Sequence, residues 1–195
     1  MTKRIVSLKK LMNGLVKNGD KGLTGRARGI RMREAIEKML KEEKGGVRVV
    51  LDFSGVGPID FSWADEVVAT LVSRLWSGEY GEKYLLLKGL TPSQAENINV
   101  ALERKRLAVL ISGPEGWQVI GILNNYLART LDQVMKRKVL TLRQYSEEEK
   151  IGMNTSGTRL LNLYKKRLVV RLEGPSKKKD DPHRGGQFIY RSLLS

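Results

Sequence analysis

The chain of 195 residues contains no cysteine and only one histidine, His183. Without cysteine there can be no disulfide bond, no thiolate zinc site and no cysteine nucleophile. A single histidine cannot build a two-histidine metal site, and a Ser-His-Asp triad would have to recruit it from a predicted loop. We therefore expect no metal, no cofactor and no enzymatic activity.

Long hydrophobic runs are also missing. No apolar stretch approaches the ~18 residues that a membrane-spanning helix needs, and no charged-then-apolar leader ends in small residues. From these two absences we expect a soluble, cytoplasmic protein that does not associate with a membrane.

Acidic residues are scarce relative to basic ones, at 21 against 36, which gives a formal net charge of +15 and a pI near 10.1. The excess is concentrated toward the C-terminus, because residues 116–195 hold 16 basic and 7 acidic side chains. A basic balance of this kind favours a polyanionic partner, and the concentration of charge favours a nucleic acid.

A helical period changes into a strand period within residues 152–171. At roughly 100° per residue, Ser156, Leu160, Leu163 and Tyr164 fall on one side of the predicted helix. The opposite side holds Thr155, Thr158, Arg159, Asn162, Lys165 and Lys166. We expect the first side to be buried and the second to face a polyanion.

Two β-prone runs, 168–172 and 187–193, flank a polar stretch rich in Gly, Pro, Lys and Asp, and predict a long-tipped hairpin. Upstream, Thr141 and Gln144 have the spacing of a capping box that begins a short helix ending near Glu149. Gly152 and Asn154 then supply the turn into the next helix.

On these features, residues 116–194 resemble the winged helix-turn-helix family of DNA-binding domains. Arg167 stands where the family often has Gly, between the second helix and the wing. The resemblance implies that the second helix enters the major groove of double-stranded DNA and that the wing touches the backbone. Base edges would be contacted by Thr158, Arg159 and Asn162. Phosphates would be held by Thr155, Lys165, Lys166, Lys177, Lys178, Lys179 and Arg184.

The N-terminal half alternates helices and strands. Met32, Ile36, Met39 and Leu40 mark a helix that opens at Thr24 or Gly25 and ends before Gly45. Strands are predicted at 47–53, 84–87 and 107–111, and further helices at 62–78 and 92–106. This alternation predicts an α/β layer sandwich with a mixed or largely parallel sheet.

Residues 49–66 read Val-Val-Leu-Asp-Phe-Ser-Gly-Val-Gly-Pro-Ile-Asp-Phe-Ser-Trp-Ala-Asp-Glu. This segment resembles the STAS-like domains that are similar to anti-sigma-factor antagonists, and the resemblance extends over residues 24–112. Phosphorylated members of that group have a serine directly after the second Asp. Here that position is Phe61, and we expect the following Ser62 to be a helix N-cap rather than a phosphorylation switch.

Four acids, Asp52, Asp60, Asp65 and Glu66, are expected to gather where the strand ends, the edge at which open α/β sheets bind ligands. Basic residues crowd the start of the preceding helix, where each costs about 0.3–1 kcal/mol against the helix dipole. These residues are Arg26, Arg28, Arg31 and Arg33. An ion-pair network, a nucleotide or phosphate pocket and a protein-docking edge would each explain the arrangement.

The segment Gly113-Pro-Glu-Gly116 is predicted to link two domains, 1–115 and 116–195. A broad apolar stripe from Val119 to Val134 predicts a helix that packs on the first domain, on a second subunit of a homodimer, or on its own core. Together these features predict a DNA-binding transcriptional regulator with an N-terminal sensing or docking domain. The alternative is a protein-interaction switch, in which the N-terminal domain binds a regulatory protein and the basic domain is an accessory.

Overall fold

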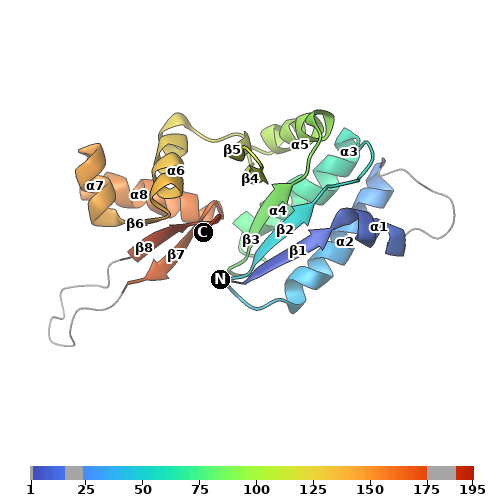
Figure 1. The fold of residues 1–195 in the computed structure, drawn as a ribbon, viewed down its shortest axis with the longest axis horizontal. Coiled ribbons are helices and arrows are strands. Elements are labelled where there is room, and N and C mark those ends of the chain that lie inside the picture. The colour runs from blue at the N-terminus through green and yellow to red at the C-terminus, as the bar shows by residue number, and fades with distance from the viewer. Residues whose placement is uncertain (1, 16–23, 175–187) are drawn as a thin grey trace. The chain divides into compact units, whose positions relative to one another are not determined.

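The computed structural model describes residues 2–15, 24–174 and 188–195, and the chain forms two compact units, Met1–Leu123 and Asn124–Ser195 (Figure 1). The boundary lies after Leu123, later than the 115/116 boundary expected from the sequence. The difference arises because residues 116–121 form a strand of the first unit.

The first unit is built on a five-stranded sheet in the order β1-β2-β3-β4-β5 (Figure 1). Its strands are β1 (Lys3–Ser7), β2 (Arg48–Asp52), β3 (Tyr84–Lys88), β4 (Ala108–Gly113) and β5 (Gly116–Gly121). The first four are parallel and β5 runs antiparallel to β4, which confirms the mixed, largely parallel sheet. Alternating residues of the central strands, including Leu51, Leu87 and Ile111, enter the hydrophobic core.

The helices of this unit are α1 (Leu8–Leu15), α2 (Arg26–Glu42), α3 (Phe61–Ala64), α4 (Thr70–Trp76) and α5 (Pro92–Arg104). A π-helical turn, η1 (Asp65–Ala69), joins α3 directly to α4. The predicted apolar side of α2 is confirmed, since Met32, Ile36 and Leu40 are buried in the core. Trp63 of α3 is fully buried, and its ring meets Phe53 edge-on at 6.1 Å.

The cap of α3 differs from the prediction. Asp60 has an extended backbone and its Oδ1 accepts a hydrogen bond from the backbone N–H of Trp63 at 2.8 Å. Ser62 is already inside the first turn, so the prediction that Ser62 caps this helix is wrong. A carboxylate at the residue before the helix satisfies the free N–H more strongly than a hydroxyl placed two residues later.

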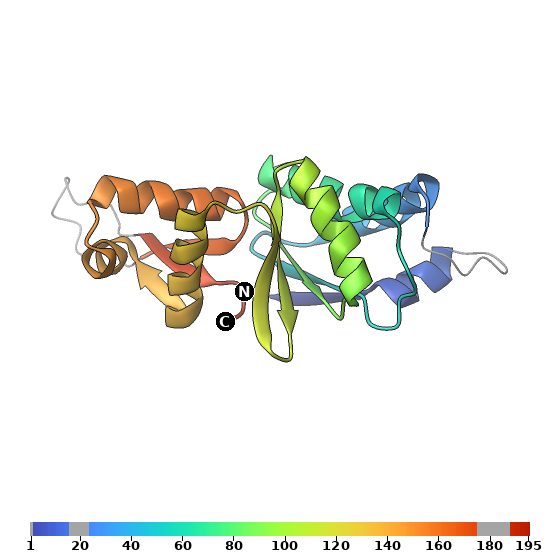
Figure 2. The same ribbon diagram turned by 90° about the horizontal axis from the view of Figure 1, so that it is seen from above.

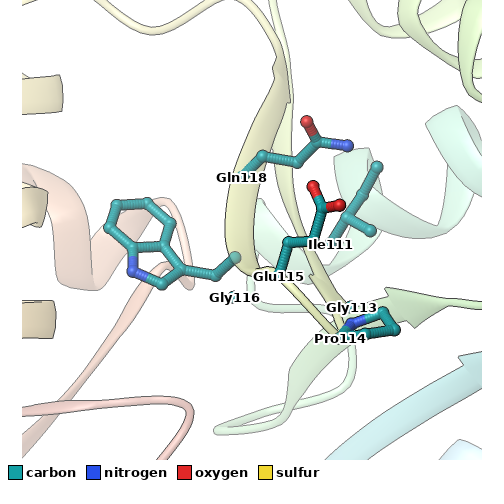
Figure 3. Close-up of a pocket in the computed structure, with 7 residues that line it drawn as sticks. Ile111, Gly113, Pro114, Glu115, Gly116 and Gln118 are labelled. Atoms are coloured by element: carbon teal, nitrogen blue, oxygen red, sulfur yellow. The ribbon is translucent and has the colours of Figure 1, made fainter.

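The segment 113–116 is the turn of the β4–β5 hairpin and not a linker between domains (Figure 3). Val119 and Ile120, expected in a helix, pair with Leu110 and Val109 across the hairpin. An apolar run of this length fits both periods, and the hydrogen bonds to β4 select the strand. Helix α5 packs along β5 on one side of the hairpin (Figure 2).

The second unit consists of α6 (Asn125–Arg137), β6 (Val139–Thr141), α7 (Leu142–Glu149), α8 (Met153–Lys165), β7 (Val169–Glu173) and β8 (Phe188–Ser192). Its three strands form an antiparallel sheet in the order β6-β8-β7. Two predictions are confirmed here: the hairpin strands, and the capping box of α7, in which Thr141 and Gln144 bond each other's backbone. Strand β6 was not predicted.

No helix in the described part of the chain is long and apolar enough to cross a membrane.

Candidate nucleic-acid interface

Helix α8 has one buried side, as its sequence predicts. Ser156, Leu160 and Leu163 are buried where α8 packs against α6 and α7. Burial of each leucine stabilises the unit by about 1.5–3 kcal/mol. A Cβ added to Gly157 would lie 3.8 Å from the nearest methyl group of Leu142, which is an ordinary van der Waals contact between α8 and α7. This packing determines which side of α8 remains accessible.

The opposite side of α8 is polar and accessible to different degrees. Thr155, Thr158 and Lys165 are exposed, whereas Arg159, Asn162 and Lys166 are half-buried. Burial lowers the pKa of Lys166, because its ammonium group loses part of its hydration. The two-sided helix is therefore confirmed, but Lys166 does not stand free in solvent as the sequence suggested.

A groove of about 410 Å³ lies along this polar side and is lined by Tyr126, Asn154, Thr155, Thr158, Arg159 and Asn162. Tyr126 belongs to the first turn of α6, and the guanidinium carbon of Arg159 lies 5.5 Å from the centre of its ring. Sequence periodicity assigns Tyr126 to the apolar stripe of residues 119–134, and nothing local in the sequence indicates its contact with Arg159. A helix start at Asn125 would have identified it as a first-turn residue.

Cation–π contacts between arginines and aromatic rings connect the β7–β8 hairpin to α8. The guanidinium carbon of Arg171 lies 3.5 Å from the ring centre of Phe188 and 5.5 Å from that of Tyr164. Arg167 lies over the same Tyr164 ring at 5.5 Å. Tyr164 comes from α8, Arg171 from β7 and Phe188 from β8, so these cation–π contacts connect all three elements.

The basic residues predicted at the tip of this hairpin, Lys177, Lys178, Lys179 and Arg184, lie outside the described residues.

Helix α8 ends in a turn that normally uses glycine. Arg167 has φ 57°, its N–H donates to the carbonyl of Tyr164, and the N–H of Leu168 donates to that of Leu163. This pair of bonds is the Schellman arrangement, whose left-handed residue is usually Gly. Arg167 therefore adopts a left-handed conformation that favours Gly.

In the first unit, the four acids make different kinds of contact. Asp52 pairs with Lys88 at 2.9 Å, and hydrogen bonds from Lys88 and Ser54 outweigh burial to lower the pKa of Asp52. Asp60 accepts hydrogen bonds from the backbone N–H groups of Gly25 and Trp63, at 2.7 and 2.8 Å. Asp52 and Asp60 therefore serve an ion pair and backbone hydrogen bonds, respectively.

Asp65 and Glu66 form the ion-pair network that was one of the expected arrangements. Arg26 approaches Glu66 at 2.6 Å and Asp65 at 3.8 Å, and Lys105 pairs with Asp65 at 2.7 Å. Arg28 contributes differently, since its guanidinium donates to the carbonyl of Thr24 at 3.4 Å. Acids from the π-helical turn thus offset the unfavourable arginines at the start of α2.

An open cavity of about 650 Å³ lies beside the carboxyl ends of β1, β2 and β3 and includes Ser7, Lys10, Asp52 and Lys88. None of the α2 arginines lines it. A second cavity, of about 360 Å³, lies at the β4–β5 turn, where Glu115 and Gln118 point to the same side as Ile111 (Figure 3). Over residues 2–15, 24–174 and 188–195, no three Asp, Glu or His side chains come together as a metal ion requires.

Neither a protein-family model nor a curated protein matches this sequence.

Proposed function

We propose that residues 124–195 form a winged helix-turn-helix domain that binds duplex DNA, and that the chain is a transcriptional regulator. The observation that carries the proposal is the accessible polar side of α8, next to the β7–β8 hairpin. Two helices, α7 and α8, follow one another across a short turn, and the β7–β8 hairpin comes directly after them, as the proposed domain requires. A helix of this kind fits the major groove, which is about 12 Å wide.

Electrostatics supports the same partner. Residues 124–195 carry 16 basic and 7 acidic side chains, a local excess that attracts a phosphate backbone. We assign phosphate contacts to Thr155, Lys165 and Lys166, with a smaller share for Lys166 because its ammonium is half-buried. The tip residues Lys177, Lys178, Lys179 and Arg184 remain predicted phosphate contacts.

We assign the recognition of DNA bases to the central residues of α8. Thr158, Arg159 and Asn162 line the groove and carry side chains that can bond or touch base edges. The hydroxyl of Thr158 already donates to the carbonyl of Asn154 at 2.9 Å, which leaves its oxygen as an acceptor and its methyl group for apolar contact.

For the first unit we propose a STAS-like domain that senses a signal or docks a regulatory protein. The proposal rests on the Asp-Phe-Ser-Gly-Val segment at 52–56 and on the crossing from β2 to α3 that follows it. The ion pairs of Asp65 and Glu66 favour a structural role for these acids over an acid-base role in catalysis.

Fluorescence anisotropy with duplexes selected from a random pool tests the DNA-binding proposal. Arg159→Ala should reduce the preference for selected over random duplexes, whereas Lys165→Ala should weaken binding to all duplexes equally. Lys165→Ala should also lower the slope of log K against log salt by about one unit. Recovery of palindromic sites would indicate a dimer. Equal losses on every duplex for both variants would contradict the assigned roles.

A pull-down from lysate, with and without nuclease, separates this proposal from an accessory role in protein interaction. Partners lost after nuclease treatment support DNA binding. Partners that survive nuclease, together with no binding to any duplex, would overturn the proposal and favour a protein-interaction switch.

A further inference from the structure

Tyr126 is an aromatic residue placed where it adds little to the core. Its side chain is 42% exposed although it stands in the first turn of α6, whose buried residues begin at Leu127. The amide of Asn124 donates to its hydroxyl oxygen at 3.2 Å. An exposed aromatic ring can serve as a platform for a cationic side chain, and this contact uses the ring rather than the hydroxyl.

The side chain on this platform is Arg159, with its guanidinium carbon 5.5 Å from the ring centre. A guanidinium in cation–π contact with a ring does not use its N–H donors in that contact, so they can still form hydrogen bonds. In the part of the chain that the structure describes, no carboxylate forms an ion pair with Arg159 and no hydrogen bond of its guanidinium is found. Its donors are therefore available to a ligand in the groove.

The lining of the groove indicates which ligand this is. Arg159 is the one charged residue among the six that line it, and the others are Tyr126, two threonines and two asparagines. A phosphate site would be expected to gather several cations, whereas a site for base edges needs neutral polar groups around one oriented fork. Guanine presents two acceptors, O6 and N7, at the spacing of a guanidinium fork.

We propose that Tyr126 is a positioning residue that holds Arg159 for the recognition of a guanine in the major groove. This inference rests on the proposed binding of duplex DNA by the second unit. Tyr126 contributes by holding the guanidinium in one orientation before binding. The Arg159 side chain therefore loses less conformational entropy when it binds the guanine. It does not itself contact the base.

Anisotropy titrations with the full chain test the inference on the duplex selected by the wild type. One set of probes carries 7-deazaguanine at single positions, which removes N7, and a random duplex measures non-specific binding. Tyr126→Leu removes the ring, and Tyr126→Phe keeps the ring but loses the hydroxyl. The melting temperature of each variant verifies that it is folded.

We expect Tyr126→Leu to weaken binding to the selected duplex about two- to fivefold and to leave the random duplex unchanged. Tyr126→Phe should bind the selected duplex as the wild type does. Arg159→Ala should lose about 5- to 150-fold and should no longer distinguish 7-deazaguanine at one position. The double variant should lose no more than Arg159→Ala alone, because the ring acts only through the guanidinium.

Three results would overturn the inference: equal losses for Tyr126→Leu on selected and random duplexes, additive losses in the double variant, or an unchanged Tyr126→Leu. In each case the binding of duplex DNA itself would still stand. A wild-type chain that binds DNA without sequence preference would also overturn the inference alone. Absence of any duplex binding would overturn the proposed function as well, so the two failures are distinguishable.

Discussion

Gly29 of α2 lies so close to Glu66 that a Cβ added to Gly29 would be 2.9 Å from the Glu66 Cβ and 3.3 Å from the Trp63 Cα. The absence of a side chain therefore allows α2 to approach the α3–η1 helix. The same approach brings Arg26 within ion-pair distance of Glu66.

Gly29→Ala should destabilise the first unit even though alanine is the better helix former. The propensity gain of about 1 kcal/mol is outweighed by an overpacking cost of about 1–3 kcal/mol, since neither the Glu66 Cβ nor the Trp63 backbone can rotate away. All three tryptophans, Trp63, Trp76 and Trp117, lie in this unit, so urea unfolding followed by tryptophan fluorescence reports on it.

The matched control is Gly14→Ala in α1, where a Cβ would meet no atom within 4 Å. We expect this change to be neutral or to stabilise the unit by up to about 1 kcal/mol. Equal changes in unfolding free energy for the two substitutions would show that close packing does not require glycine at position 29.

Glu37 gives the first unit a dependence on acidic pH. Its Oε1 accepts hydrogen bonds from Arg33 at 2.8 Å, Arg74 at 2.7 Å and the hydroxyl of Tyr80 at 2.8 Å. Burial raises the pKa of Glu37, but the hydrogen bonds from Arg33 and Tyr80 and the charges of Arg33 and Arg74 together lower it below the usual 4.5. The stabilisation is therefore complete above pH 4.5 and is lost as the pH falls through the lower, folded-state pKa.

Glu37→Gln should lose about 1.5–3 kcal/mol of unfolding free energy at pH 7, and less as the pH falls below 4.5 through the lower folded-state pKa of the wild-type carboxylate. Urea unfolding over pH 3–7 measures this difference between the two proteins. Tyr80→Phe, which removes one donor and keeps the carboxylate, should cost less and retain most of the pH dependence. A difference between wild type and Glu37→Gln that does not vary with pH would exclude this role for Glu37.

Asp60, and not Ser62, should be the residue whose loss weakens the start of α3. Asp60→Ala removes the acceptor for the N–H groups of Trp63 and Gly25 and should cost about 1–2 kcal/mol. Ser62→Ala should change the unfolding free energy by less than about 0.5 kcal/mol. Urea unfolding followed by tryptophan fluorescence measures the unfolding free energy of both variants. A larger loss for Ser62→Ala than for Asp60→Ala would show that Ser62 is the cap.

Arg167 stores backbone strain at the end of α8. Arg167→Gly and Arg167→Ala both remove the contact with Tyr164, but only glycine relieves the positive φ. We therefore expect the free energy of unfolding of Arg167→Gly to be about 1 kcal/mol higher than that of Arg167→Ala. For a unit of this size the difference is about 4–8 °C in melting temperature, which calorimetry can resolve. Identical melting temperatures would show that this conformation costs nothing.

Local patterns in the sequence were sufficient to predict several helices and strands. The apolar and polar sides of α8, the capping box at Thr141 and the strands β2, β3 and β4 follow from side-chain periodicity and cap chemistry, which depend on residues close together in the chain. Strand β1 escaped prediction because Lys3–Ser7 buries only Val6 and lies at the edge of the sheet.

The tertiary structure decided what local patterns could not. Residues 116–121 suit a helix or a strand, and only hydrogen bonds to β4 select the strand and move the unit boundary past Leu123. The sharing of Glu37 by three donors, and the placing of Tyr126 beneath Arg159, join residues far apart in the chain. Sequence alone determined which side chains each helix offers, because a helix repeats over a few residues. Which partners those side chains meet depends on how separate elements pack.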